Sequence, residues 1–237
     1  MSIEFEEVGA NLDRQYPQHQ YIWQTWSDRE LTLSSLGTHF GYVLTGQPAL
    51  IQADGTAYPL SPGMYFTLPR SGTLLGKKSS GFVITYLNFS RPFTLGGPIE
   101  SPGEFAYIDG GSTDILLPPI HRGDPGLYAL HFPPQVAQTM HDHPTDRIGI
   151  VVAGDGYCLT PECEYNFQPG MVMRIPQGMP HKFLTLDRGL SLVTFHPDSD
   201  IGFSDTNHPM LLQTYVDGVS AVDLPHLLTK DRYRSTP

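Results

Sequence analysis

The sequence predicts an all-β protein built from two similar β-barrels in tandem, and three observations lead to that prediction. The 237-residue chain contains 24 glycines and 22 prolines, scattered among short apolar runs as tight turns between short strands require. Hydrophobic residues make up 39% of the chain, which is enough for a sizeable core. Residues 41–69 and 149–176 repeat one pattern, with glycines 108 positions apart and prolines 107 positions apart, and residues 83–86 and 192–195 extend the match. Such a repeat indicates a duplicated barrel.

The first copy of the repeat contains two expected strands joined by a hairpin. Residues 41–46, Gly-Tyr-Val-Leu-Thr-Gly, begin with an apolar run, and a polar hairpin follows around Asp54-Gly55. After the turn at Pro62-Gly63, the run Met-Tyr-Phe-Thr-Leu forms the next strand and ends before Pro69.

The second copy has the same order of elements. The apolar run at residues 148–153 is followed by Gly154-Asp155-Gly156, which we interpret as a hairpin. Residues 171–175, Met-Val-Met-Arg-Ile, lie between turn residues on both sides and are predicted to form a strand. Each copy therefore supplies strands of the length that a small barrel uses.

The connection between the copies and the carboxyl end are less regular. The connection is rich in glycine and proline, but its apolar residues 115–120 are predicted to add an edge strand, where proline is tolerated. After residue 198 the strand pattern fades into a tail. Residues 220–229 are expected to form a short helix capped by Ser220 and interrupted by Pro225.

Three histidines in the second copy have the spacing of metal ligands. His141 and His143 stand two positions apart, so on a β-strand their side chains point to the same face. His181 arrives from a later strand. Imidazole nitrogens are common ligands of transition metals, and three at one place are enough for a mononuclear site.

The residues around these histidines resemble the two motifs of the cupin superfamily. The matching positions are His141, His143 and Gly154 in the first motif, and Gly170, Pro176, Gly178 and His181 in the second. Three positions depart from the motifs: Gln135 replaces an opening glycine, Thr185 a closing asparagine, and Arg147 the acidic ligand. The resemblance implies two cupin (jelly-roll) barrels in tandem, with a metal held by the three histidines.

Arg147 is the departure that matters most, because a guanidinium has no lone pair to give a metal. We expect it to point into the barrel beside the metal, where its planar fork suits a carboxylate or enolate oxygen and gives it a catalytic role. A purely structural pairing with a buried acid is the alternative. Asp146 would reach the metal only if the strand slipped by one residue, which would turn the apolar set to the wrong face.

The first copy lacks the ligands. The positions equivalent to His141, His143, Arg147 and His181 are Leu33, Ser35, His39 and Leu74. One imidazole cannot make a mononuclear site, so we interpret His39 as a core or lid residue. The predicted domains are therefore residues 1–100, a degenerate cupin barrel without metal ligands, and residues 101–237, a metal-binding cupin barrel with a carboxyl-terminal tail.

Charge and cysteine content narrow the functional classes. The net charge is −10, which disfavours nucleic acid or an anionic membrane as a partner. The first residues lack the basic start and apolar core of a signal peptide, so we predict a cytoplasmic protein. Cys158 and Cys163 flank an expected turn at residues 160–162. Two reduced thiols are the default in the cytosol, and a disulfide across the turn is the alternative.

We expect the second barrel to bind one divalent transition metal. Fe(II) is favoured, and Zn, Ni, Mn or Cu are alternatives that the sequence cannot separate. No other cofactor is expected. Similarity to three-histidine cupins implies a dioxygenase or oxygenase acting on a small oxygenated anion. A metal-dependent isomerase or lyase is the second hypothesis, and a non-catalytic small-molecule-binding cupin is the third. The expected partner is a small-molecule substrate, and a homodimer remains open.

Overall fold

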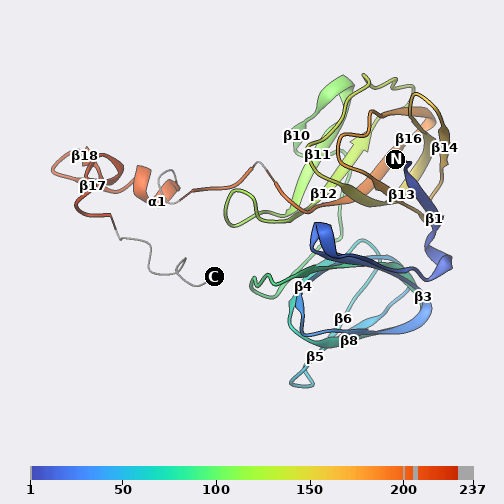
Figure 1. Ribbon diagram of the computed structural model, residues 1–237, viewed down its shortest axis with the longest axis horizontal. Helices are drawn as coiled ribbons and strands as arrows, with labels where there is room; N and C mark the ends of the chain where they lie inside the picture. Colours follow the sequence, from blue (N-terminus) through green and yellow to red (C-terminus); the bar gives the residue numbers. More distant parts are fainter. Residues whose placement is uncertain (1, 200, 205–207, 229–237) are drawn as a thin grey trace. The chain divides into compact units, whose positions relative to one another are not determined.

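The computed structural model describes residues 2–199, 201–204 and 208–228 and confirms the predicted all-β class. The described part of the chain contains one α-helix, α1 (Pro209–Leu212), and four 3-10 turns. These turns are Val8–Ala10, Pro17–His19, Ile108–Gly110 and Ala221–Asp223. The chain divides into two compact units, residues 1–118 with 125–198, and residues 119–124 with 199–237. The first unit holds both large sheets (Figure 1).

The first sheet has eight strands and comes from the amino-terminal half of the chain. Its main path runs β2 (Asp13–Tyr16), β3 (Tyr21–Leu33), β8 (Gly72–Leu87), β4 (Gly37–Thr45), β7 (Tyr65–Pro69) and β9 (Thr94–Gly96). Two further strands, β5 (Ala49–Gln52) and β6 (Ala57–Pro59), form the predicted hairpin around Asp54-Gly55, and β5 also pairs with β8.

The second sheet also has eight strands. Its main path runs β10 (Phe105–Ala106), β11 (Ser112–Leu117), β12 (Gly126–Phe132), β16 (Lys182–His196), β13 (Arg147–Leu159), β15 (Met171–Ile175) and β1 (Glu4–Glu7). A further strand, β14 (Glu164–Phe167), pairs with β13. The predicted strand over residues 171–175 is confirmed as β15, and the strand predicted over 115–120 is present as β11, which ends before Pro118. The predicted edge position is wrong, because the short strand β10 pairs with β11 on its outer side.

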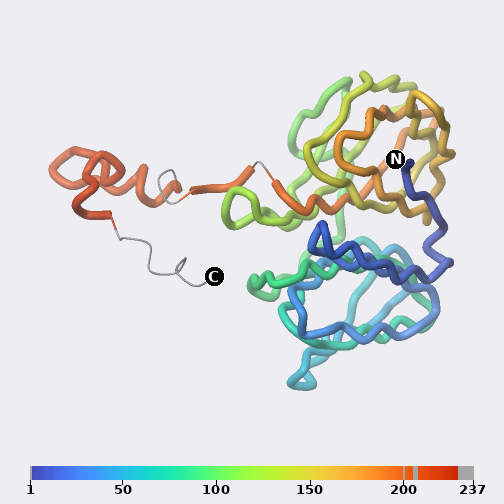
Figure 2. Tube along the Cα trace, in the orientation of Figure 1, coloured from blue at the N-terminus to red at the C-terminus, as the bar shows by residue number. Residues whose placement is uncertain are grey.

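The two sheets have the same strand order. The path β2-β3-β8-β4-β7 of the first sheet corresponds to β11-β12-β16-β13-β15 of the second. Figure 2 follows the chain through these strands by its colours, from blue at the amino terminus toward red. One strand differs in origin: the position beside β15 is filled by β1 from the amino terminus, which pairs antiparallel from Glu4↔Arg174 to Glu7↔Met171. Neither sheet closes on itself in the described residues.

Three apolar clusters form the core of the first unit. One lies between the sheets and includes Trp23 and Phe40 from the first and Ile148 from the second. The other two each belong to one sheet. Leu33 and Leu74 are in the cluster of the first sheet, and Val151 is in that of the second. Alternation along β13 therefore sends odd-numbered side chains near Arg147 into the second sheet's own cluster and even-numbered ones toward the first sheet.

Two predicted local elements are wrong. Gly154-Asp155-Gly156 is not a hairpin, because β13 continues through it and stays paired with β16 across register shifts, as in a β-bulge. Gly154 has φ +81°, which explains the glycine. The turn comes later, where Thr160 Oγ1 accepts a hydrogen bond from the backbone N–H of Cys163. The expected helix over residues 220–229 is a single 3-10 turn at Ala221–Asp223 without a side-chain cap; Thr229 lies outside the described residues.

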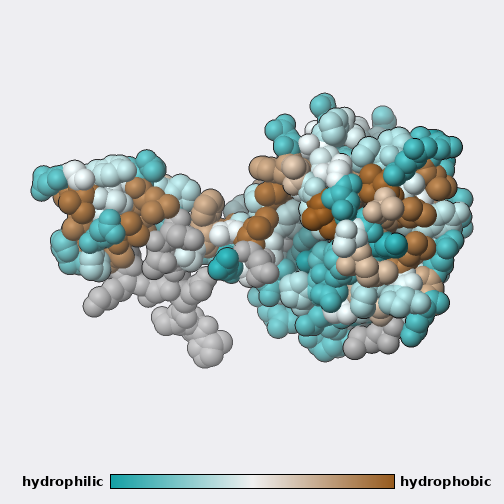
Figure 3. Space-filling model, turned by 90° about the horizontal axis from the view of Figure 1, so that it is seen from above, coloured by the Kyte–Doolittle hydropathy of each residue, from teal (hydrophilic) through white to brown (hydrophobic). Residues whose placement is uncertain are grey.

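The second unit is small and mostly exposed. It contains α1 and a short hairpin of β17 (Tyr215–Val216) and β18 (Val219–Ser220). Ala221 is its one buried hydrophobic residue among those described, while Met210 is 76% exposed. Figure 3 shows brown, apolar residues on its surface. In the described part of the chain, no helix is both long and apolar enough to span a membrane.

Candidate functional site

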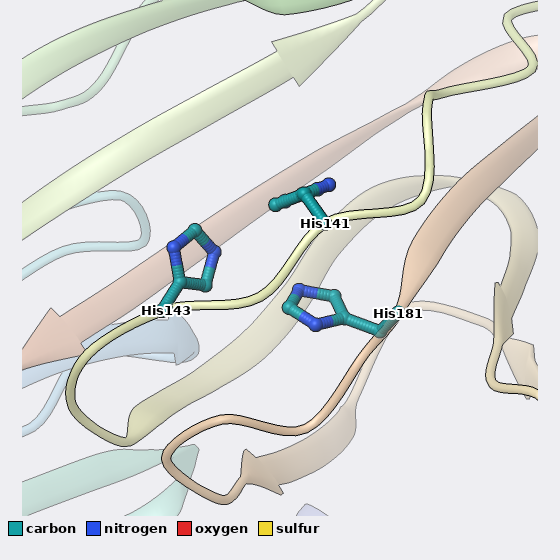
Figure 4. A group of neighbouring side chains, drawn as sticks. All are labelled: His141, His143 and His181. Atoms are coloured by element: carbon teal, nitrogen blue, oxygen red, sulfur yellow. The ribbon is translucent and has the colours of Figure 1, made fainter.

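The three predicted histidines come together beside the second sheet. One ring nitrogen from each of His141, His143 and His181 lies within 4.8 Å of the others. The ring centroids are 5.0 Å apart for His141 and His143, 4.7 Å for His141 and His181, and 5.2 Å for His143 and His181. Figure 4 shows the three rings converging from two neighbouring segments of the chain. This group could hold a metal ion.

Backbone hydrogen bonds hold the two segments against each other. The N–H of His141 donates to the carbonyl of His181 at 3.0 Å, and the N–H of His181 donates back at 2.8 Å. Two residues along, the N–H of Gly178 donates to the carbonyl of His143 at 2.9 Å. His141 and His181 thus form an isolated bridge, and His143 lies outside any strand. The expectation that both motif histidines lie on a regular β-strand is wrong, although a ring nitrogen of His141 and one of His143 still lie within 4.8 Å of each other.

The hydrogen bonds of two rings select the tautomer that a metal needs. Nδ1 of His141 lies 2.8 Å from the carbonyl oxygen of Thr139, and Nδ1 of His181 lies 2.8 Å from that of Met179. A carbonyl only accepts, so each Nδ1 carries the proton. In the neutral ring the lone pair is then on Nε2, which is the arrangement in which metal-bound histidines are usually held.

The surroundings also keep the rings of His143 and His181 neutral. Burial, followed by the charges of Arg147 and the other two histidines, lowers the pKa of His143 to about 3. Burial is also the main cause that lowers the pKa of His181 to about 4. A neutral imidazole binds a metal without first losing a proton. The donor set therefore fits a divalent transition metal.

Arg147 lies at the start of β13, on the face that carries Val151 and the second sheet's own cluster. Its Nη1 donates to the carbonyls of Thr145 and Asp146 and to the Thr145 hydroxyl at 2.7–3.1 Å. Its charge contributes to the lowered pKa of His143, His181 and His196. The arginine is half-buried and close to the histidine group. We call the face of β13 that carries Arg147 and Val151 the inner face of the second sheet.

The acid in this region has other partners. The carboxylate of Asp146 is buried and accepts hydrogen bonds from Tyr21, from the guanidinium of Arg174 and from the backbone N–H of Gln177. The strand register is Arg147↔Ile175, so the slip that would carry Asp146 to the metal does not occur.

His196 lies on the same face of the second sheet as Arg147, and its place differs from what the sequence indicates. A surface or turn position is the default for His196 in the sequence, but the structure places it at the end of β16 on the face of Leu192, where its ring stacks on Tyr128 with centroids 4.3 Å apart. Burial and then the charge of Arg147 hold the pKa of His196 well below its usual value. The alternation Leu192, Thr194, His196 along one strand is the feature of the sequence that could have indicated this.

The first sheet has no comparable group among its described residues. Leu33 and Leu74 are buried in its apolar cluster. His39 is fully buried; its Nδ1 lies 2.8 Å from Thr85 Oγ1, and its Nε2 lies 2.8 Å from two backbone carbonyls. This is the core role that the sequence indicates.

The two cysteines are free: Cys158 is buried and Cys163 is exposed. Burial raises the pKa of the Cys158 thiol to about 12, which leaves it protonated and unreactive at neutral pH. The alternative of a disulfide across the turn is therefore not what the structure has.

No protein-family model matches the sequence, and no curated protein is similar to it in sequence. Solved structures do match. A cupin 2 conserved barrel domain protein from Leptotrichia buccalis aligns with a TM-score of 0.58 at 11% identity, over 83% of this chain and 89% of its own. The chain has a cupin fold. The same fold is found in the protein YlbA from E. coli, with a TM-score of 0.55 at 14% identity over 85% of this chain and 93% of that one. Salicylate 1,2-dioxygenase from Pseudaminobacter salicylatoxidans matches with a TM-score of 0.58 at 10% identity, over 83% and 84% of the two chains.

Proposed function

We propose that this cupin is a metal-dependent enzyme that acts on a small oxygenated anion. His141, His143 and His181 are the proposed ligands of one divalent transition metal per chain. The observation that carries the proposal is the geometry of the group: three ring nitrogens lie within 4.8 Å of one another, and two rings have Nδ1 bound to a carbonyl. Metal-binding histidines usually donate their second ring N–H to a carbonyl or carboxylate in this way.

Fe(II) is the proposed metal, with Zn, Ni, Mn or Cu as alternatives. When bound, such a metal supplies a Lewis acid for a chelating oxygen and, as Fe(II), a partner for dioxygen. The chain supplies the remaining parts of the site. The three imidazoles leave open positions, because no carboxylate of the described residues belongs to the group and Arg147 stands where many cupins have an acidic ligand.

Arg147 is the proposed catalytic residue that binds the substrate. Its guanidinium is on the inner face, close enough to His143 for its charge to act on that ring. A carboxylate that approaches the metal would meet this charge and gain a charge-assisted hydrogen bond. The ring of His196, stacked on Tyr128, lies on the same face and would border the bound anion. The arginine would both orient the substrate and balance its charge.

Oxidative cleavage or oxygenation is the reaction we favour. Structures of the salicylate 1,2-dioxygenase with the same fold include one in complex with gentisate, a small aromatic carboxylate. A ligand of that class carries an anionic group for Arg147 and oxygen atoms for the metal. We therefore propose a dioxygenase-like activity on a hydroxylated carboxylate.

The tandem arrangement and the division of labour between the halves belong to the same proposal. We propose a bicupin in which residues 1–100 form a metal-free barrel and residues 101–237 carry the metal. The shared strand order of the two sheets and the buried Leu33 and Leu74 support it. Because β1 pairs with β15, one strand from residues 1–100 belongs to the proposed second barrel.

Oxygen consumption tests the proposed reaction. Protein loaded anaerobically with Fe(II) is mixed with gentisate, salicylate, a β-diketone or a small thiol, and uptake is followed with an oxygen electrode. We expect uptake with at least one carboxylate, and none above background for His181→Ala. Equal uptake by the wild type and the variant would contradict the proposal. Turnover without oxygen uptake would replace oxygenation by an isomerase or lyase reaction.

A further inference from the structure

A single buried carboxylate connects the two histidine-bearing segments. The Asp146 side chain is 1% exposed, and each of its oxygens has a defined partner. Oδ1 accepts a hydrogen bond from the backbone N–H of Gln177 at 2.9 Å. Oδ2 accepts a hydrogen bond from the hydroxyl of Tyr21 at 2.6 Å. The same oxygen forms an ion pair with Arg174, whose Nη2 lies 2.9 Å away.

The Gln177 contact joins this carboxylate to the turn that precedes His181. Gln177 belongs to the turn that leads into His181, and the N–H of the next residue, Gly178, donates to the carbonyl of His143. Asp146 itself follows His143 by three residues. The Asp146 carboxylate therefore connects the segment that carries His143 with the turn that precedes His181.

The hydroxyl that binds Asp146 comes from the other half of the chain. Tyr21 begins β3 of the first sheet, is fully buried, and is 125 residues from Asp146 in sequence. Burial raises the pKa of Tyr21 far above its ordinary value, so its hydroxyl stays protonated and can donate. Its oxygen also accepts a hydrogen bond from Nε of Arg174 at 2.7 Å. The hydroxyl thus fixes the two charged groups relative to each other.

We infer that Tyr21 and Asp146 are positioning residues through which the first sheet determines the geometry of the metal centre in the second. The inference rests on the proposed function, because it concerns the same three histidines. It gives the metal-free half of the chain a specific role: the hydroxyl orients the carboxylate, and the carboxylate orients the two ligand-bearing segments. Removal of a group that orients metal ligands commonly weakens metal binding by roughly 10- to 100-fold. Tyr21 acts on the ligands through Asp146, so its removal should have a smaller effect.

A matched pair of tyrosines allows this role to be separated from simple stabilisation. The hydroxyl of Tyr16 also donates to a carboxylate at 2.6 Å, that of Glu4, and Tyr16 is also buried. Glu4 pairs with Arg174 and Arg14, and among the described residues its carboxylate has no hydrogen bond or ion pair with the histidine-bearing segments. Tyr21→Phe and Tyr16→Phe therefore remove the same chemical group from the same network, and only the first acts directly on Asp146.

The test uses Co(II) as the probe. The Co(II) dissociation constant is measured by competition with a chelator, and the visible absorption spectrum of the bound ion reports the ligand geometry. We expect Tyr21→Phe to weaken Co(II) binding roughly five- to tenfold and to change the spectrum. The Co(II) dissociation constant of Tyr16→Phe should stay within about twofold of the wild-type value, and its spectrum should be unchanged. This should hold even if Tyr16→Phe loses as much thermal stability as Tyr21→Phe.

A carboxylate pair gives a second test, which also serves if Tyr21→Phe does not fold. Asp146→Asn should weaken Co(II) binding roughly 10- to 100-fold, whereas Glu4→Gln should not. The inference is overturned if the Tyr21 and Asp146 variants bind Co(II) as the wild type does. It is also overturned if the Co(II) dissociation constant changes equally in Tyr21→Phe and Tyr16→Phe, or equally in Asp146→Asn and Glu4→Gln. Failure of the wild type to bind Co(II), or full binding by His143→Ala, would instead overturn the proposed function and this inference with it.

Discussion

Replacement of His39 by alanine should destabilise the protein substantially without removing its metal. The ring is fully buried in the first sheet, with Nδ1 on Thr85 Oγ1 and Nε2 on the carbonyls of Ser34 and Arg70. Because carbonyls only accept, Nε2 carries the proton and Nδ1 accepts from the threonine. Loss of hydrogen bonds worth about 1 kcal/mol each, together with the cavity left by the ring, should lower the free energy of unfolding by about 3 to 4 kcal/mol.

Urea unfolding and metal analysis of the same samples check both parts of this prediction. Thr85→Val is the matched control, because it removes one partner of the ring and should cost about 1 kcal/mol. The metal content of His39→Ala should equal that of the wild type under conditions in which the variant is folded. A decrease in the free energy of unfolding of less than about 1 kcal/mol would refute the packing argument. Loss of metal from the folded variant would refute the assignment of the metal to the second sheet alone.

Three further predictions concern substrate, pH and backbone. Arg147→Gln should leave metal content unchanged but weaken binding of gentisate-class carboxylates, measured by calorimetry, by about 1.5 to 3 kcal/mol; equal binding would remove Arg147 from the site. Burial lowers the pKa of five histidines below 6.5, so the unfolded chain takes up protons first and stability falls as pH decreases through 6.5; these are His39, His131, His143, His181 and His196. Urea unfolding at pH 7 and pH 5.5 should show a loss of at least about 1 kcal/mol, and a gain would contradict the burial of these rings. Gly154→Ala should lower the melting temperature, because a Cβ there would lie 2.1 Å from the Gly189 carbonyl oxygen at a φ of +81°; an unchanged melting temperature would argue against the bulge.

The parts of the fold that follow from local pattern were predictable from the sequence. The strand over residues 171–175 has turn residues on both sides, and the hairpin around Asp54-Gly55 follows from the preference of that dipeptide for tight turns. The three histidines also follow from spacing, since an extended backbone turns His141 and His143 to one side whether or not it belongs to a sheet. These features depend on neighbours in sequence.

The features that depend on distant partners were not predictable in this way. Gly154-Asp155-Gly156 has the composition of a hairpin, and only its continued pairing with β16 makes it a bulge. The strand β1 carries one apolar residue, Phe5, among three glutamates, and nothing in it indicates β15, about 170 positions away, as its partner. Asp146 likewise has no local feature that indicates Tyr21. In each case the decisive contact joins segments that the sequence separates widely.

The metal content of the purified protein tests the central claim most directly. Elemental analysis of the wild type should find about one divalent transition metal per chain, and His143→Ala, which removes one of three nitrogens that lie within 4.8 Å of one another, should retain little or none. Circular dichroism of both proteins confirms that the variant is folded. Full occupancy in the folded variant, or two metals per chain in the wild type, would contradict the account.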